Sequence, residues 1–159
     1  MKAKFINESL GDILRPKSKD QIINDLKKLS LDERNRLLRK VAERGQKNVI
    51  ELLIKAGADI DAKSEGGWSA LMLAATDGHK DVVKLLLNAG ADIDAKADNG
   101  WSALIFAARE GHKDVVELLI KAGVDVNVKT NYGQNAFMYA VAYGHKDVVE
   151  LLKRYGVKE

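Results

Sequence analysis

Apolar positions recur at helical spacing in two kinds of segment that alternate along most of the chain. In residues 81–87 (DVVKLLL) they stand at i, i+1, i+3 and i+4, which is one broad face of a helix. A shorter apolar segment runs from Ser69 to Ala75, and the serine oxygen can accept a hydrogen bond from an unpaired N–H at a helix start. Gly78 and Gly90 follow the two segments, and glycine is the usual residue where a helix stops. The pattern predicts a short helix, a tight turn and a second helix.

This unit repeats every 33 residues. The string GWSAL begins at Gly67 and again at Gly100, and GHKDVV begins at Gly78, Gly111 and Gly144. A related string, GQNAF, occupies the GWSAL position of the last unit, and a more divergent copy upstream continues into ELLIKAGADIDAK. Between units the chain is polar, bounded by glycine and too short for a third helix, so we expect an extended loop or hairpin there. One unit is too small to bury its own helix faces, and stacking on its neighbours completes the core.

The unit has the form G-x-[ST]-x-L-x-x-A-A-x-x-G-H-x-x-V-V-x-L-L-x-x-x-G-A-D and resembles the ankyrin repeat. The resemblance implies an all-α, ankyrin-type α-solenoid of about four 33-residue helix-turn-helix repeats with hairpin-like finger loops. The family's usual Thr-Pro-Leu-His start is replaced here by SALM, SALI and NAFM, which removes a proline and a histidine from each unit. The repeat domain is expected at 31–159, with repeats at approximately 31–63, 64–96, 97–129 and 130–159.

An N-terminal extension and helical cap is expected at 1–30. Residues 17–30 form an amphipathic pattern, and Ser18 with Gln21 has the spacing of a capping box. Ser30 and Glu33 repeat that spacing and predict the start of the next helix. We interpret the first helix as half a repeat that caps the stack, and the alternative is a detachable helix that binds a partner. A weaker helical pattern covers residues 6–14.

Composition excludes several classes of site. The chain has no cysteine, which removes disulfides, thiolate nucleophiles and cysteine-based metal sites. No apolar run approaches the roughly 18 residues that a membrane span needs, and polar residues interrupt any leader-like segment at the N-terminus. We therefore expect a cytoplasmic protein without a membrane partner. The net charge is only +3, but basic residues concentrate near the N-terminus at Lys27, Lys28, Arg34, Arg36, Arg39, Lys40 and Arg44.

Three histidines and two Gly-Trp-Ser strings are the motifs that could carry chemistry. His79, His112 and His145 recur once per unit, which places them about 8 to 10 Å apart in a helical stack, whereas two ligands of one zinc ion each lie about 2 Å from it. We assign them a structural role at the turns. Ser69 and Ser102 lack the second glycine of a nucleophile elbow and are interpreted as helix caps. We predict no catalytic residue, no metal site and no cofactor, and hence a non-enzymatic protein.

Trp68 and Trp101 follow the unit glycine where each finger is expected to meet a helix. Aromatic residues at that position either brace neighbouring repeats or form a binding ridge, because Trp, Tyr and Arg dominate interface energetics. The ankyrin resemblance implies that partners bind the concave face formed by the fingers and the first helices. In this chain the corresponding residues are Trp68, Leu73, Thr76, Asp77, Asp98, Asn99, Trp101, Phe106, Arg109, Glu110, Tyr132, Gln134, Tyr139 and Tyr143.

The leading hypothesis is a protein-protein interaction module that binds one or more proteins through this concave surface. We expect a monomer, because both ends of the stack are interpreted as capped. One alternative is a stable repeat scaffold, natural or engineered, without a dedicated ligand. Another, less favoured, is a polyanion-binding module that uses the basic N-terminal residues, since nucleic-acid affinity depends on contacts between cations and phosphates.

Overall fold

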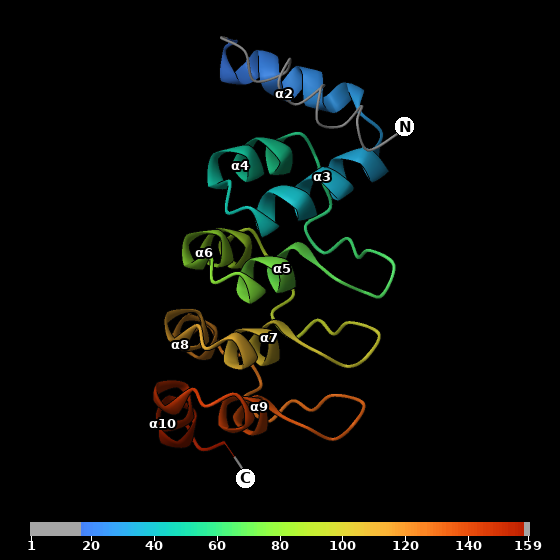
Figure 1. The fold of residues 1–159 in the computed structure, drawn as a ribbon. Coiled ribbons are helices and arrows are strands. Elements are labelled where there is room, and N and C mark those ends of the chain that lie inside the picture. The colour runs from blue at the N-terminus through green and yellow to red at the C-terminus, as the bar shows by residue number, and fades with distance from the viewer. Residues whose placement is uncertain (1–16, 158–159) are drawn as a thin grey trace.

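The computed structural model describes residues 17–157, which form pairs of helices stacked in a single row (Figure 1). This confirms the all-α solenoid. Within the described residues the helices are α2 (Lys19–Lys28), α3 (Leu31–Glu43), α4 (Lys47–Lys55), α5 (Ala70–Thr76), α6 (Lys80–Asn88), α7 (Ala103–Glu110), α8 (Lys113–Lys121), α9 (Ala136–Ala142) and α10 (Lys146–Arg154).

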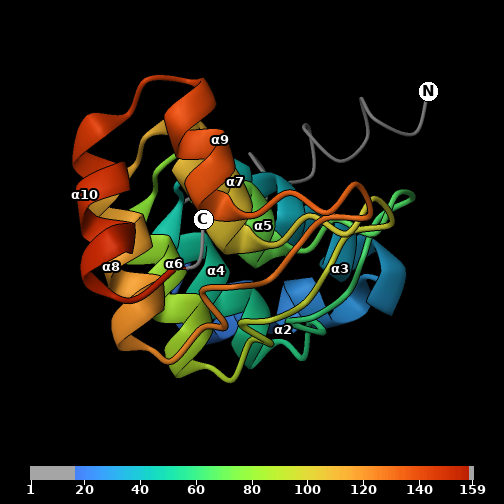
Figure 2. The same cartoon turned by 90° about the horizontal axis from the view of Figure 1, so that it is seen from below.

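The helices lie in two layers. The inner helices α3, α5, α7 and α9 pack on one another in order, and the outer helices α4, α6, α8 and α10 form the second layer. The finger loops, which join each outer helix to the next inner helix, extend to the same side of the stack (Figure 2). Each helix pair falls inside one of the repeat ranges expected from the sequence, although the division of the chain at those boundaries stays a prediction.

The inner helices start where the sequence predicts. Ser69 and Ser102 are buried, and their hydroxyl oxygens accept hydrogen bonds from the backbone N–H groups three residues later. Asn135 does the same for α9 through its side-chain oxygen, at 3.0 Å from the N of Met138. An N-cap of this kind stabilises a helix by about 1 kcal/mol. These caps confirm the predicted role of the two serines.

Glycine is required at the turn between the inner and outer helices for two reasons. Gly78 has a φ of 72°, in the left-handed region that favours glycine. A Cβ on it would also lie 2.6 Å from Nδ1 of His112 in the next repeat. The turn is therefore a place where one repeat closely approaches the following one.

Each turn histidine connects its repeat to the preceding one. His79 Nε2 lies 2.8 Å from the carbonyl oxygen of Glu43, His112 Nε2 lies 2.8 Å from that of Thr76, and His145 Nε2 lies 2.7 Å from that of Arg109. In each pair the ring N–H donates to a carbonyl near the end of the preceding inner helix. The geometry confirms a structural role for the three histidines and shows that each of them joins two neighbouring repeats.

Aspartates of the finger loops form a second connection between repeats. The backbone N–H of Asp92 donates to Oδ1 of Asp61 at 2.8 Å, and that of Asp125 donates to Oδ1 of Asp94 at 3.0 Å. The Asp-x-Asp strings therefore hold successive fingers side by side. Within a finger, one antiparallel bridge joins Lys96 to Ser102, so the expected loop or hairpin is an irregular loop with a single bridge.

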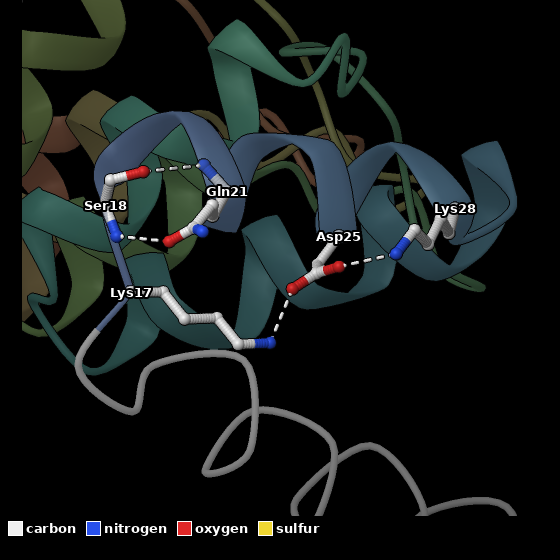
Figure 3. A network of polar contacts seen from close by, with 5 residues as sticks. All are labelled: Lys17, Ser18, Gln21, Asp25 and Lys28. Carbon is white, nitrogen blue, oxygen red and sulfur yellow. Dashed lines mark hydrogen bonds and ion pairs between the residues drawn. The ribbon is translucent and has the colours of Figure 1, made fainter.

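The helix α2 covers the N-terminal end of the stack. It packs on α4 with Ile22 and Leu26 buried. Ser18 and Gln21 form both hydrogen bonds of the predicted capping box (Figure 3), and the second box is present at the start of α3. The helical pattern over residues 6–14 lies outside the described residues.

A network of three charges joins α2 to Lys17, the residue before its N-cap. Asp25 accepts hydrogen bonds of 2.7 Å from Lys17 and from Lys28 (Figure 3). These hydrogen bonds, Lys17 first, lower the pKa of Asp25 from 3.8 to about 2. The cap helix therefore has a buried apolar side and a polar side stabilised by charge.

Candidate functional site

Four aromatic rings form a continuous row across three repeats. The ring centroid of Trp68 lies 4.3 Å from that of Phe106, Phe106 lies 4.8 Å from Trp101, and Trp101 lies 4.5 Å from Tyr139. The rings are tilted against one another by 33° to 46°, and such tilted contacts contribute about 0.5 to 1.5 kcal/mol each beyond burial. We call these four residues the aromatic row.

The finger loops position the two tryptophans. Gly100, which precedes Trp101, has a φ of 80°, and a Cβ there would lie 2.6 Å from the backbone N of Asn131 in the next finger. The finger thus turns sharply and close to its neighbour just before Trp101. Each tryptophan then reaches forward to a ring on the next inner helix, Trp68 to Phe106 on α7 and Trp101 to Tyr139 on α9.

Burial along the aromatic row is uneven. Phe106 is 3% exposed and contacts the rings of both tryptophans. Trp68, Trp101 and Tyr139 are partly buried and pack against the core. The tryptophans make the contacts expected of bracing residues, and they also keep part of their surface exposed to solvent.

Arg109 links the aromatic row to an exposed tyrosine. Its guanidinium carbon lies 5.6 Å from the ring centroid of Trp101 and 5.1 Å from that of Tyr143, within the range of cation–π attraction. The adjacent Tyr143 hydroxyl is the main cause of a raised pKa of Arg109. Arg109 also forms an ion pair of 3.1 Å with Glu110. Its charge is therefore held in place between two rings.

Two tyrosines stand out from this surface. Tyr132, at the end of the last finger, is 79% exposed, and Tyr143, at the end of α9, is 53% exposed. Tyr139, on α9, donates its hydroxyl hydrogen to Oε1 of Gln134 at 2.6 Å. Contiguous exposed apolar patches often mark interaction sites, whereas single exposed apolar side chains are normal.

The other predicted site residues lie along the same side. Of the residues predicted for this surface, Phe106 alone is buried. Leu73 and Thr76 are partly buried, and the Thr76 hydroxyl donates to the carbonyl of Met72 within its own helix. The remaining predicted residues are exposed polar ones: Asp77, Asp98, Asn99, Glu110 and Gln134.

Residues at one equivalent position change in character along the surface. Positions 33 residues apart, at the ends of the inner helices, hold Arg44, Asp77, Glu110 and Tyr143, and all four are exposed. This position is therefore basic in the first repeat, acidic in the next two and aromatic in the last. Arg44 belongs to this series, although the sequence analysis placed it only in the basic cluster.

The basic N-terminal residues are largely used within the fold. Arg34 and Arg39 donate hydrogen bonds to the carbonyls of Ala56 and Ala62. Arg36 pairs with Asp32, and Lys28 pairs with Asp25. The two ion pairs offset the charges of Lys28 and Arg36, and the two hydrogen bonds to carbonyls hold the guanidinium groups of Arg34 and Arg39 against the fold.

The described residues offer neither a metal-binding cluster nor a membrane span. Between residues 17 and 157, no three His, Asp or Glu side chains lie close enough together to hold a metal ion. In the same range no helix has the length and apolar character of a membrane span. A hollow of about 400 Å³ at the turns of neighbouring repeats is lined by Gly45, Gly78, His79, Lys80, Asp81, Val82 and Asp114, none of which belongs to the aromatic row.

The sequence analysis did not single out Met138 and Val141 on α9. Both side chains are exposed in the structure. Their position in the chain could have indicated this exposure. The matching residues of earlier repeats are followed by another inner helix that packs on them, and α9 is the last inner helix of the described residues.

Comparison with known proteins gives one family. The family model described as "Ankyrin repeats (3 copies)" matches residues 13–97 and 94–158. No curated protein matches the chain.

Proposed function

The chain belongs to the ankyrin repeat family, and from that premise we propose that it binds a protein partner through its finger loops and inner helices. Ankyrin repeats are generally protein-protein interaction modules and typically non-enzymatic. The proposed binding surface is centred on Trp101 and Arg109. It extends to Tyr132 and Tyr143 at one end and to Asp77 at the other.

The observation that carries this proposal is a cluster of side chains beside the aromatic row, where Arg109 connects Trp101 of the row to the exposed Tyr143. Trp101, Arg109 and Tyr143 are adjacent in space, and these three residue types are the ones most enriched among interface hot spots. Contact with the buried ring of Phe106 restricts the motion of the tryptophans. Side chains that are already ordered lose less conformational entropy when a partner binds.

The charges around the row indicate the character of the partner. Asp77, Asp98 and Glu110 are exposed around the aromatic residues, and Arg109 is already paired with Glu110. A partner segment with apolar or aromatic residues flanked by basic ones would complement this arrangement. Charge complementarity of this kind mainly raises the association rate and the specificity.

A non-enzymatic role agrees with how the serines are used. Ser69 and Ser102 are buried, and their oxygens accept backbone hydrogen bonds at helix starts. Neither hydroxyl is presented to a substrate. The surface therefore offers contact area and charge, which supports binding as its role.

The test compares two exposed tyrosines with a matched third. Proteins retained from an extract of the source cells by the immobilised chain are identified by mass spectrometry, and the captured protein is then purified and titrated. Tyr132→Ala/Tyr143→Ala should weaken its binding by about 2 kcal/mol or more. Tyr155→Ala is the control, because Tyr155 is exposed at the C-cap of α10, outside the proposed surface. All three proteins should have the same unfolding temperature. Equal binding by the double variant and the control would contradict the proposal.

A further inference from the structure

On α7 the chain holds a guanidinium of its own against the aromatic row. Arg109 lies 5.6 Å from the ring centroid of Trp101 and 5.1 Å from that of Tyr143, and it pairs with Glu110 at 3.1 Å. A planar guanidinium can stack on an aromatic face and donate to a carboxylate at the same time. A tryptophan with a neighbouring carboxylate therefore accommodates an arginine side chain on this surface.

The preceding repeat presents an equivalent tryptophan and carboxylate. The residues 33 positions before Trp101 and Glu110 are Trp68 and Asp77. The two tryptophans are held in the same way, because each ring packs on a ring of the next inner helix, with centroids 4.3 Å apart for Trp68 and 4.5 Å apart for Trp101. Trp68 is partly buried and Asp77 is exposed, so part of each remains accessible to a partner.

The residue that corresponds to Arg109 in this repeat is Thr76. Its side chain has no charge, and its hydroxyl donates to the carbonyl oxygen of Met72 at 2.8 Å within its own helix. The ion pairs formed between residues 17 and 157 do not include Asp77. The tryptophan and carboxylate are thus present here without a guanidinium from the chain. We call Trp68, Thr76 and Asp77 the Trp68 subsite.

A second carboxylate makes the surroundings of Trp68 more negative than those of Trp101. A Cβ on Gly67, just before Trp68, would lie 2.7 Å from Oδ1 of Asp98 in the next finger. The residue at the same place beside Trp101 is Asn131, which is an uncharged amide. The ion pairs of the described residues do not include Asp98 either. Charge complementarity at the Trp68 subsite therefore favours a cation.

We propose that the Trp68 subsite binds an arginine side chain of the protein partner, with the guanidinium over the Trp68 ring and paired with Asp77. This inference rests on the proposed function and specifies one side chain of the partner. The carboxylates select a cation, and the arrangement of Arg109 on the equivalent tryptophan selects arginine. Lysine fits less well, because its compact ammonium lacks the planar group that stacks on a ring.

The first test uses random peptides displayed on phage, selected for binding to the immobilised chain. The enriched peptides should contain arginine, and one of them is synthesised and titrated by calorimetry. Replacing its arginine by citrulline removes the charge and keeps the length, and should weaken binding about tenfold or more. Replacement by lysine should also weaken binding. Equal affinities of the arginine and citrulline peptides would overturn the proposal.

The second test changes the chain. Thr76→Arg supplies a guanidinium at the position that Arg109 has in the next repeat, so it should compete for the Trp68 subsite and weaken peptide binding about tenfold or more. Thr76→Gln is the matched control, because it adds a long side chain without charge, and it should bind the peptide like the unmodified chain. Circular dichroism should show the same helical content for all three proteins. Unchanged binding by Thr76→Arg would contradict the proposal.

Tyr132→Ala/Tyr143→Ala separates this inference from the proposed function. If that variant loses peptide binding and Thr76→Arg keeps it, the surface binds a partner and the assignment of arginine to Trp68 is wrong. If both variants bind the peptide like the unmodified chain, the peptide lies elsewhere, which counts against both proposals. A selection that enriches no arginine overturns the inference alone, because capture from a cell extract tests the proposed function independently.

Discussion

Each repeat contributes residues to the interior of the stack and to its inner surface. Residue identity is kept between repeats at the interior position compared here and changes at the surface position. In the interior, Ala74, Ala107 and Ala140 occupy one position, and all three are fully buried. On the surface, Asp77, Glu110 and Tyr143 occupy another, and all are exposed. Close packing of inner helices leaves little space for change in the interior. The position that agrees between repeats is therefore an interior one, and the position that differs is exposed on the surface proposed to bind a partner.

One position lies at the boundary between these regions. It holds Leu73, Phe106 and Tyr139 in successive repeats, with Phe106 buried and the other two partly exposed. Phe106 and Tyr139 accept the contact of a tryptophan from the preceding finger. Here a residue that varies between repeats also packs on the preceding finger, so a substitution at this position should affect stability as well as the surface proposed to bind a partner.

The largest effect should come from the interior. Leu104 is fully buried, and Leu104→Ala should lower the free energy of unfolding by about 2 to 5 kcal/mol, since truncation leaves a cavity. Leu73→Ala makes the same chemical change on the inner surface and should lower it by clearly less. Urea denaturation measures both values. Losses of equal size would remove the distinction between the two regions.

An intermediate effect is expected for the tryptophans. Trp101→Ala removes contacts with two rings, those of Phe106 and Tyr139, and should lower the free energy of unfolding by about 1 to 3 kcal/mol. Trp68→Ala removes one such contact and should lower it by less. Thermal unfolding followed by circular dichroism would show the order. A larger loss for Trp68→Ala would mean that ring contacts do not determine stability along the row.

A smaller effect is expected for the histidine connections. His112→Ala removes the hydrogen bond to the carbonyl of Thr76 and should lower the free energy of unfolding by about 1 kcal/mol, the usual net value of such a bond. Lys113→Ala changes the adjacent exposed residue and serves as the control. If denaturant midpoints of the two variants coincide, the histidine does not stabilise the repeat interface.

The smallest effect concerns the cap helix. The pKa of Asp25 is lowered from 3.8 to about 2, so the stabilisation from its ion pairs is present above about pH 4 and is lost as pH falls toward 2. Asp25→Asn should remove this part of the acid dependence and make stability change less between pH 4 and pH 2. Unfolding curves measured across that range test it. Added salt should reduce the difference because these groups are exposed; a difference that salt leaves unchanged would contradict this origin.

Much of the fold could be predicted from local signals. The 33-residue period, the serine caps of α5 and α7 and the Ser18–Gln21 capping box depend on residues close in sequence, and all are present. The histidines were placed correctly at turns, but their bonding partners could not be predicted. His112 Nε2 bonds a carbonyl 36 residues earlier, and that pairing depends on the offset between stacked repeats.

The candidate site was less predictable for the same reason. The sequence places Trp101 and Tyr139 in different repeats, and only the stacking offset shows that their rings touch. That offset also buries Phe106, which the sequence analysis placed on the binding surface with its neighbours. Exposure of Met138 and Val141 depends on what lies beyond them, which a repeat pattern alone does not report.

The histidine connections have a consequence for how the chain opens. Each one couples a repeat only to the repeat before it, so the stack behaves as a short one-dimensional lattice with nearest-neighbour coupling. A middle unit such as α7–α8 is coupled on both sides, whereas α9–α10 is coupled on one. Fraying should therefore start at α9–α10 and travel inward, so that amide hydrogens there exchange earliest.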